Sequence, residues 1–401
     1  MKFKANQKLL DKAIRTVEGY TSKEGSTGSA KHQQLILAIA DADSNSLRLT
    51  AENELSAIEY TINKDIEVEK SGTILVPAHR LQVSVSNVVG DEIEFSFSDL
   101  ELQMKAGKRK LSLATLDHHS SILPRIDESG DAFAEFSGSD FIAGFKGGAA
   151  MYDSAESSIS SNVYISIDNK KSTFVSRIST GVSYRRVPVK SKEKFEALVS
   201  RRLLSEIVGQ ISDEDKVALS VSGQLLHVNI TGDKVNKHVS VALSAHDVSK
   251  FNFGTVYKTL CNVSKASTIF SVDKRALVNT FKAADTIASL NTKTEVRDIR
   301  VKVEKGTGIV ISFDSHSGFE DVVEAKTIVG ESAELNFRWN RFTDLFDSYP
   351  NAEQITIALV PNPDNSIQAL VLIDDENFSQ GDDPESLEYI AMAAASKNEN
   401  R

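Results

Sequence analysis

The chain has 401 residues, 40% of them hydrophobic and 25% charged, with 7 prolines and 21 glycines, which is the composition of a folded protein of several domains and excludes a disordered or collagen-like chain. Its single cysteine excludes a disulfide framework and a zinc cluster built of cysteines. The formal net charge of −10, from 46 basic and 56 acidic residues, excludes nucleic-acid capture by a strongly basic surface, but leaves a locally basic wall open.

The N-terminal stretch and the apolar runs indicate where the protein resides. Lysine and arginine recur through residues 1–20, so no uninterrupted apolar core of a signal peptide is present there. No run of 18 consecutive apolar residues occurs. We therefore expect a cytoplasmic protein that makes no use of a membrane.

Residues 1–125 are predicted to form one unit of strands and helices. A short strand precedes an amphipathic helix over 7–19, in which five apolar residues recur with the 3.6-residue period. Alternating apolar and polar residues then predict four strands, and Pro77 suits the first turn of a second helix over 77–89. Three further strands close the unit near Pro124.

The same order of elements recurs twice more along the chain. The second occurrence has its helices over 138–154 and 200–211, and the third has them over 272–289 and 337–348. Three copies of roughly 130 residues predict three α+β domains of similar topology. We place these domains at 1–125, 126–256 and 257–401.

The connector before the third copy, residues 250–267, has no clear period and contains Cys261. A nucleophilic cysteine needs a base beside it, and the sequence places none there. A buried or half-buried thiol in a connector is therefore the favoured interpretation of Cys261.

Every predicted helix carries at least one cation. In the first helix Lys8, Lys12 and Arg15 follow at i, i+4 and i+7 and lie opposite the apolar stripe. Together the six predicted helices hold 12 basic and 9 acidic side chains, in a chain that is acidic overall. Ordinary solubilising surface charge explains so small an excess equally well.

Several segments are similar to those of one known family. "MKFKANQKLLDKAI" and "SGTILVPAHRLQVSVSNVV" occur in the first copy, "STFVSRISTGVSYRRVPV" in the second, and "ESAELNFRWNRFTDLFDSYP" and "LEYIAMA" in the third. They resemble the three domains of the bacterial β sliding clamp, the processivity subunit of DNA polymerase III. The likeness spans nearly the whole chain but rests on many apolar positions. Divergence of this degree suits a phage- or plasmid-borne member.

The resemblance implies a non-catalytic protein without cofactors. Two chains would join head to tail into a pseudo-sixfold ring of DNA-clamp domains, with two helices of each domain facing inward and antiparallel sheets outside. The ring would enclose double-stranded DNA without sequence specificity. The residues expected to face the DNA are Lys8, Lys12, Arg15, Lys23, Arg80, Lys146, Arg201, Arg202, Arg275, Lys282, Arg338 and Arg341.

The resemblance also implies a pocket between the second and third domains, where a DNA polymerase, a clamp loader and repair factors insert short peptides. Its expected lining is Thr180, Gly181, Tyr184, Arg186, Val187, Leu204, Leu260, Ile390 and Met392. For Leu204 and Ile390 a plain core role is an equal alternative. Typical members have Thr-Asp-Gly-His-Arg-Leu and a Met-Pro-Met-Arg-Leu end at these places, and this sequence has neither, so we expect an altered pocket and a private partner peptide.

The contact that closes the ring is the third site implied by the resemblance. An edge strand carrying Lys108, Lys110 and Leu111 would meet Ile287 and Leu290 of a second copy, with acidic residues opposite the lysines. Basic residues on an edge strand also discourage unwanted strand pairing, which is the alternative interpretation of these lysines.

Two rival classes of function remain at this stage. An enzyme is disfavoured because the sequence has no P-loop, no G-x-S-x-G, no H-E-x-x-H and no dinucleotide fingerprint. His118 and His119 lack a carboxylate for a metal site, and the acidic run over 374–386 lacks EF-hand spacing and is interpreted as a solvated loop. The second rival is a non-catalytic three-domain structural or binding protein that does not close into a ring.

Overall fold

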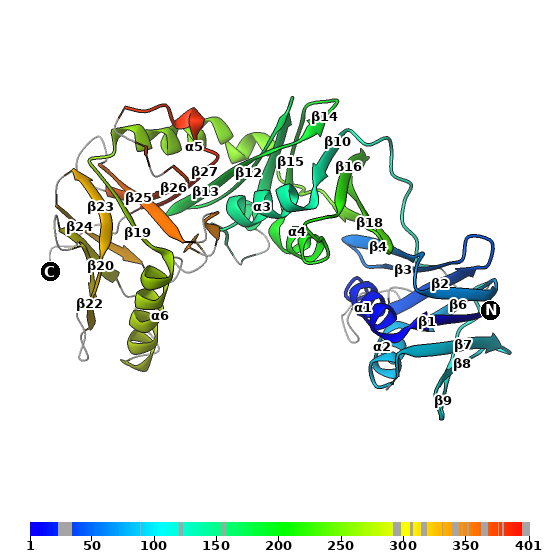
Figure 1. Cartoon of the computed structure of the whole chain (residues 1–401). Helices are drawn as coiled ribbons and strands as arrows, with labels where there is room; N and C mark the ends of the chain where they lie inside the picture. Colours follow the sequence, from blue (N-terminus) through cyan, green and yellow to red (C-terminus); the bar gives the residue numbers. More distant parts are fainter. Residues whose placement is uncertain are drawn as a thin grey trace. The chain divides into compact units, whose positions relative to one another are not determined.

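The computed structural model describes most of the chain as two compact units. The residues described are 1–22, 34–88, 90–119, 123–153, 155, 158–291, 298–304, 308–313, 319–330, 332–338, 345–346, 348–350, 353–361, 368–375, 377–378 and 381–394. Unit 1 comprises residues 1–141, 189–193 and 205–243, and unit 2 comprises 142–188, 194–204 and 244–401. Both combine helices with antiparallel sheets (Figure 1), which confirms the predicted α+β class.

The first repeat of elements runs from β1 to β9. Its members are β1 (Lys2–Asn6), α1 (Gln7–Glu18), β2 (Leu35–Asp41), β3 (Ser46–Glu52), β4 (Ser56–Ile62), β5 (Ile66–Lys70), β6 (Gly72–Pro77), α2 (Ala78–Ser86), β7 (Glu92–Ser98), β8 (Glu101–Ala106) and β9 (Arg109–Ala114).

The second repeat runs from β10 to β18, and a connector follows it. The members are β10 (Ala134–Ser137), α3 (Gly138–Gly148), the short 3₁₀ helix η2 (Ile159–Ser161), β11 (Asn162–Asp168), β12 (Lys171–Ile178), β13 (Gly181–Pro188), β14 (Lys190–Ser191), β15 (Phe195–Ser200), α4 (Arg201–Val208), β16 (Lys216–Ser222), β17 (Leu225–Thr231) and β18 (Val235–Ala242). The connector contains η3 (Val248–Phe251), α5 (Phe253–Leu260) and η4 (Cys261–Lys265).

The third repeat runs from β19 to β27. Its members are β19 (Thr268–Asp273), α6 (Lys274–Asn291), β20 (Asp298–Glu304), β21 (Gly308–Phe313), β22 (Phe319–Val323), β23 (Ala325–Gly330), β24 (Ala333–Arg338), β25 (Gln354–Pro361), β26 (Gln368–Ile373), η6 (Pro384–Ser386) and β27 (Tyr389–Ala394). Most of the helix predicted over 337–348 falls outside the described residues.

Some elements differ from the sequence-based predictions. The pattern did not predict β5, β13, β15 or β24, and Arg338 ends β24 instead of lying in a helix, because β24 pairs with β20 along its whole length. The connector is not irregular, since it contains α5. Helix α3 ends at Gly148, six residues before the predicted end.

Each repeat has nine strands, which are counted here from one to nine within the repeat. These strands are arranged in two sheets in the same order in all three repeats. The fifth, first, seventh, eighth and ninth strands form one sheet in that order, and the fourth, third, second and sixth strands form the other. The three-domain boundaries themselves stay a prediction, because the compact units divide the second repeat between them.

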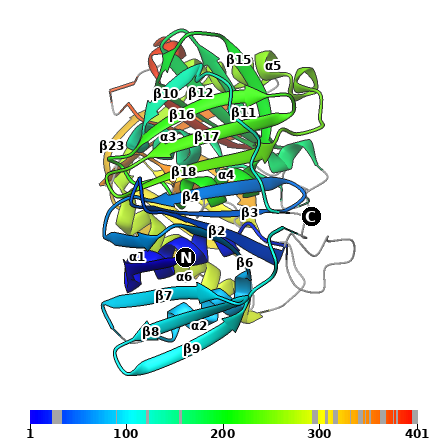
Figure 2. The same ribbon diagram turned by 90° about the vertical axis from the view of Figure 1, so that its right-hand side faces the viewer.

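Two junctions join successive repeats into continuous sheets. In unit 1, β18 of the second repeat pairs with β4 of the first to complete a nine-stranded sheet (Figure 2), with Val239 opposite Ile58. In unit 2, β27 of the third repeat pairs with β13 of the second, with Met392 opposite Val182. Each junction therefore joins the ninth strand of one repeat to the fourth strand of the repeat before it.

Ion pairs accompany the strand pairing at both junctions. Beside β4 and β18, the Lys234 amine lies 2.6 Å from the Asp65 carboxylate. Beside β13 and β27, the Arg185 guanidinium lies 3.3 Å from Asp374 and is only 15% exposed. The backbone ladder and a charge pair together specify which edges meet, because a slipped register would separate the charges.

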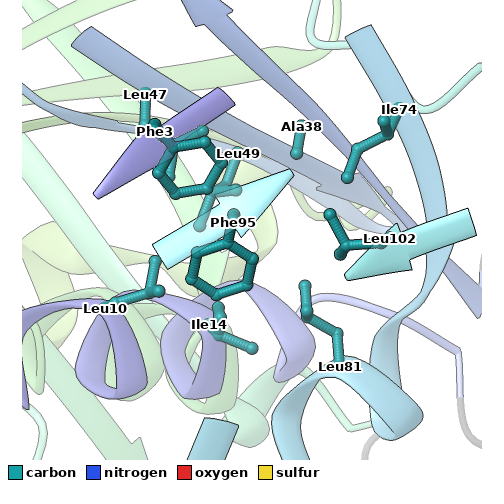
Figure 3. Close-up of a pocket in the computed structure, with 10 residues that line it drawn as sticks. All are labelled: Phe3, Leu10, Ile14, Ala38, Leu47, Leu49, Ile74, Leu81, Phe95 and Leu102. Carbon is teal, nitrogen blue, oxygen red and sulfur yellow. The ribbon is translucent and has the colours of Figure 1, made fainter. Parts of the chain in front are cut away.

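The core of the first repeat lies between its two sheets and the apolar face of α1. The Asn6 side chain caps α1 by accepting a hydrogen bond from the Leu9 amide at 3.1 Å. Leu10 and Ile14 face inward and are 1% exposed. Together with β1, β2, β3, β6, β7, β8 and α2 they enclose a small apolar cavity (Figure 3), lined by Phe3, Leu10, Ile14, Ala38, Leu47, Leu49, Ile74, Leu81, Phe95 and Leu102.

Helix α3 packs unusually close to β12 because glycines face the strand. A Cβ at Gly144 would come within 2.5 Å of the Phe174 ring, and one at Gly148 within 2.4 Å of the Phe174 carbonyl oxygen. Phe174 is fully buried. Neither the ring nor the strand backbone can withdraw, so these positions require glycine.

We predict that Gly148→Ala lowers the free energy of unfolding by about 1–3 kcal/mol, the usual cost of overpacking a core. Gly254→Ala is the matched control. No atom lies within 4 Å of where its Cβ would stand, so the helical alanine should be neutral or slightly stabilising. Urea unfolding of both variants measures the difference, and equal midpoints would contradict the packing argument.

The buried His227 of β17 and the half-buried His238 of β18 form a pair. His227 Nδ1 lies 3.0 Å from His238 Nε2, so the hydrogen bond requires at least one neutral ring. Burial lowers the pKa of His227, and the charge of Asp127 opposes this shift in part. Burial, helped by His227, lowers the pKa of His238 to about 4. Glu59 lies opposite His238 on β4.

The depressed pKa values make folding pH-dependent. Below about pH 6.5 the unfolded histidines bind protons that the folded pair resists, so stability falls as the pH drops from about 6.5 to about 4. His238→Gln should flatten this part of the curve relative to the parent protein, and urea titrations at each pH measure it. Parallel curves for the two proteins would show that the pair does not titrate as described.

Candidate functional surfaces

Helices α1 and α2 carry the basic residues predicted in the first repeat. Lys8, Lys12 and Arg80 are exposed, whereas the apolar face of α1 is buried. Arg15 is also exposed, but its Nε donates to Asp11 at 2.9 Å and its Nη2 to Ser86 at 3.0 Å. Because Ser86 belongs to α2, Arg15 also ties the two helices together.

The second repeat gives its predicted basic residues different environments. Lys146 on α3 and Arg202 on α4 are exposed. Arg201 is half-buried, since its Nε donates to the Ala149 carbonyl at 2.9 Å and its guanidinium lies 3.6 Å from the centre of the Tyr152 ring. Arg201 therefore satisfies a carbonyl just beyond the end of α3, and its charge is already engaged inside the protein.

In the third repeat, Arg275 and Lys282 on α6 are exposed. Arg338 belongs to β24, and its side chain lies outside the described residues. Arg341, and Lys23 of the first repeat, lie wholly outside the described residues. Helices α1, α2, α3, α4 and α6 together hold ten basic and five acidic residues, whereas the whole chain carries −10. The excess of cations is therefore concentrated on these helices.

The residues predicted to line a partner pocket meet where β13 pairs with β27. Tyr184, Leu260, Ile390 and Met392 belong to one apolar cluster in unit 2, with exposed fractions of 0–7%. Gly181 stands opposite Ala393, and the exposed Thr180 accepts a hydrogen bond from the Ala394 amide. Val187 and Leu204 are buried but are not members of this cluster.

Apart from the exposed Thr180 and the half-buried Arg186, the accessible part of this region consists of residues that were not predicted. Ile159, Val182, Val248, Phe253 and Tyr257 are half-buried and pack on the cluster from outside. We call these five residues the docking surface. The sequence did contain a signal for its aromatic members, because Phe253, Val256, Tyr257 and Leu260 repeat at helical spacing within the connector.

A ladder of aromatic rings holds α5 against the second repeat. Tyr164 of β11 stacks on Phe253 with the ring centres 5.1 Å apart, and Phe253 lies 5.7 Å from Tyr257. Tyr257 in turn lies 5.9 Å from Tyr184 of β13, whose ring is covered by the Arg186 guanidinium at 5.6 Å. Ring pairs at these distances stabilise the packing beyond the effect of buried area alone, so the docking surface is largely preformed.

Strands β9 and β22 each lie at an edge of their sheet. Among the described strands, β9 pairs only with β8, and β22 pairs only with β21. Arg109 and Lys110 are exposed on β9 and Lys108 in the turn before it, whereas Glu320 and Asp321 are exposed on β22. Each edge also exposes one aliphatic side chain, Leu111 at 41% and Val322 at 47%.

The helix residues predicted for the same contact are less accessible. Ile287 of α6 is half-buried and packs on the core of the third repeat. Leu290 ends the same helix, and its side chain lies outside the described residues. Glu320 and Asp321 of β22, which the sequence analysis did not name, are acidic residues of the kind expected opposite the lysines.

In the part of the chain that the structure describes, no three histidine, cysteine or acidic side chains gather where they could hold a metal ion. His118 and His119 lie side by side with ring centres 3.9 Å apart. Among the described helices, none is both long and apolar enough to cross a membrane.

No family model matches the chain, and no curated protein matches its sequence. Solved structures match it over nearly the whole length. The β subunit of DNA polymerase from Streptococcus pyogenes has a TM-score of 0.79 at 16% identity, covering 99% of this chain and 100% of that one. The DNA polymerase sliding clamp from Bacillus subtilis matches with a TM-score of 0.79 at 13% sequence identity, and 99% of each chain is covered. A sliding clamp from Pseudomonas aeruginosa bound to griselimycin matches with a TM-score of 0.76 at 14% sequence identity, and 99% of each chain is covered.

We predict that Arg201→Gln lowers the free energy of unfolding by about 1–3 kcal/mol, because the Ala149 carbonyl loses its donor and Tyr152 loses its cation. Lys146→Gln, which removes an exposed charge, should change it by less than about 0.5 kcal/mol. Urea unfolding measures both. Equal stability of the two variants would mean that Arg201 has no such structural role.

Proposed function

We propose that this chain, whose fold is that of the bacterial β sliding clamps, is a DNA sliding clamp. In this role two copies enclose double-stranded DNA and tether the replicative polymerase to it without performing chemistry. The observation that carries the proposal is the full-length match to several clamps, combined with two complementary strand edges that one chain leaves unpaired.

Ring closure follows from repeating the junction that the chain already makes twice. The ninth strand of the second repeat meets the fourth strand of the first, and the ninth strand of the third meets the fourth strand of the second. The remaining ninth strand is β9 and the remaining fourth strand is β22. A second copy supplies the missing partner for each, which gives a closed pair with two equivalent contacts.

The chemistry of the two edges supports this pairing. Arg109 and Lys110 on β9 would face Glu320 and Asp321 on β22, and the exposed Leu111 and Val322 would bury each other. Charges that prevent an edge from pairing with a copy of itself favour its pairing with an edge of opposite charge. The sequence-based pairing of Leu111 with Ile287 and Leu290 belongs to the same proposed contact.

Enclosure of DNA also agrees with the dimensions of helices. Two helices in each of three repeats, as the sequence predicts, would give twelve helices in two copies, and at a spacing of about 10 Å these would surround a hole roughly 28 Å wide. A duplex of about 20 Å passes through with a layer of water to spare. The exposed candidates for its wall are Lys8, Lys12, Arg15, Arg80, Lys146, Arg202, Arg275 and Lys282.

Weak attraction is what a sliding ring requires. A wall that held many phosphates would release many counterions and bind tightly, whereas enclosure retains DNA without strong contacts. The modest excess of cations on the helices and the acidic remainder of the chain fit that requirement. No group in the proposed wall reads base edges, so we expect no sequence preference.

Partner proteins would bind on the docking surface. It combines half-buried aliphatic and aromatic groups over a rigid core, which suits short segments with apolar anchors. A DNA polymerase and a clamp loader are the partners that the fold suggests.

The ring predicts a particle of about 88 kDa by size exclusion with light scattering, twice the 43.8 kDa of the chain. Val322→Asp should give monomers at micromolar concentration, because a carboxylate would be desolvated against Leu111 in place of the apolar contact. Leu55→Asp, at a site that is 46% exposed and lies on neither edge, should leave the dimer intact. A parent protein that is monomeric at the same concentration would favour the alternative of a three-domain binding protein that forms no ring.

Retention on DNA tests the enclosure itself. After loading, the parent protein and Leu55→Asp should stay on nicked circular plasmid during gel filtration and leave it after linearisation, because only a free end releases a ring. Val322→Asp should not be retained. Retention on linear DNA equal to that on circles would contradict enclosure.

A further inference from the structure

Asp321, on the edge strand β22, is held in one orientation by helix α6. Its Oδ2 accepts a hydrogen bond from the Thr280 hydroxyl at 2.8 Å, and its Oδ1 accepts one from the Val322 amide at 2.9 Å. Thr280 is buried, whereas Asp321 is exposed. A carboxylate has roughly four acceptor sites, so this one can still receive a guanidinium from outside.

Arg109, on the edge strand β9, is held in a similar way by the end of α2. Its Nη1 donates to the Asn87 carbonyl at 3.2 Å, and Asn87 is the first residue after that helix. Carbonyls at a helix end lack partners within the helix, so a cation is favourable there. Among the residues that the structure describes, neither Arg109 nor Asp321 makes an ion pair. Both charges are therefore oriented but not compensated within one copy.

Arg109 occupies a place that recurs on the ninth strand of every repeat. On β18 the Lys237 amine donates to the Gln210 carbonyl, just beyond the end of α4. On β27 the Tyr389 hydroxyl donates to the carbonyl of the helical residue Leu345 at 3.4 Å. In each repeat this residue thus reaches from the ninth strand to the second helix, which makes the three positions equivalent.

The two junctions within the chain show what stands opposite this place. Lys237 is opposite Tyr60 of β4, and Tyr389 is opposite Arg185 of β13. The equivalent of Tyr60 and Arg185 in β22 is Asp321. Followed from strand to strand across the sheet, all three reach the sixth strand of their repeat three residues before it ends, at Ile74, Ala197 and Leu335 of strands that end at Pro77, Ser200 and Arg338. A third junction of the same kind would place Arg109 opposite Asp321.

We propose that Thr280 is a positioning residue for ring closure, because it holds the Asp321 carboxylate where Arg109 of a second copy binds it. The inference rests on the proposed ring and identifies the charged pair that closes it. An exposed ion pair contributes little when two mobile side chains must first be ordered, but here helices have already ordered both. Since the pair lies at the surface, its contribution should fall with salt.

Mixing two charge-reversal variants of the full-length protein tests the pairing. Arg109→Asp and Asp321→Arg should each be monomeric alone at micromolar concentration, because like charges meet at both contacts of the ring. An equimolar mixture should form dimers, since one contact then joins the two reversed charges and the other keeps the original pair. Size exclusion with light scattering measures the dimer, and circular dichroism checks that each variant is folded.

A second mixture is the matched control for that pairing. Arg109→Asp mixed with Glu320→Arg introduces the same charges, but the arginine then stands one position away from the place opposite residue 109. This mixture should give far fewer dimers than the first. Equal rescue by both mixtures would show that only net charge matters and would overturn the assignment of Asp321.

Thr280→Val tests the positioning role itself. The valine keeps the bulk of the side chain and loses the donor, so the dimer dissociation constant should rise about tenfold, because both equivalent contacts are weakened. Thr280→Ser, which keeps the hydroxyl, should stay close to the parent protein. Thr286→Val is the matched control on the same helix, where an exposed hydroxyl donates to the Lys282 carbonyl at 2.9 Å, and it should not change the constant. Sedimentation velocity over a dilution series measures all four proteins.

Two further readouts distinguish positioning from a merely structural role. In an Asp321→Asn background, Thr280→Val should change the dissociation constant by less than about twofold, because no charge remains to be positioned. The parent dimer should weaken between about 50 and 500 mM salt, and Thr280→Val should show a shallower dependence. Equal weakening by Thr280→Val in both backgrounds would contradict positioning.

The outcomes separate this inference from the proposed function. A parent protein that is monomeric overturns the proposed ring and this inference with it. A dimeric parent whose charge-reversal mixture stays monomeric, or in which Thr280→Val and Thr286→Val behave alike, overturns this inference and leaves the ring standing.

Discussion

The pairing of unlike strand edges between repeats is the interaction on which the rest of the structure depends. An exposed edge offers a row of unpaired amides and carbonyls, and each repeat has such edges at its fourth and ninth strands. Within the chain, β18 meets β4 and β27 meets β13, so four of these edges are satisfied. The two that remain, β9 and β22, carry opposite charges, and in the proposed ring a second copy would pair with them through the same kind of contact.

The same pairing creates the docking surface. Val182 and Met392 are 210 positions apart in the sequence, yet they stand opposite each other because β13 accepts β27 as its neighbour. The connector then crosses this junction, and its aromatic residues stack on Tyr164 and Tyr184. A surface built this way is rigid and apolar.

Charge is distributed by role and not evenly. Cations concentrate on the helices, but the structure divides them into exposed ones, such as Lys8 and Lys282, and structural ones, such as Arg201, which is turned onto Tyr152 and the Ala149 carbonyl. Arg15 lies between these cases, since it is exposed and still joins α1 to α2. The net charge of the chain does not distinguish the exposed cations from those engaged within the protein.

Periodicity in the sequence was sufficient for the α+β class, for the threefold recurrence and for most of the strands, because alternation and the 3.6-residue repeat are local properties. It could not locate β24, which pairs with the distant β20, or β13, which pairs with the adjacent β12 and also with the distant β27, nor show that Gly144 and Gly148 are demanded by Phe174. Tyr184, Leu260, Ile390 and Met392, which were predicted to line a pocket, lie in one apolar cluster, but their burial and the partial exposure of Phe253 and Tyr257 depend on how α5 packs. Local pattern determines which faces are apolar, whereas only the assembled sheets determine which of those faces remain open to a partner.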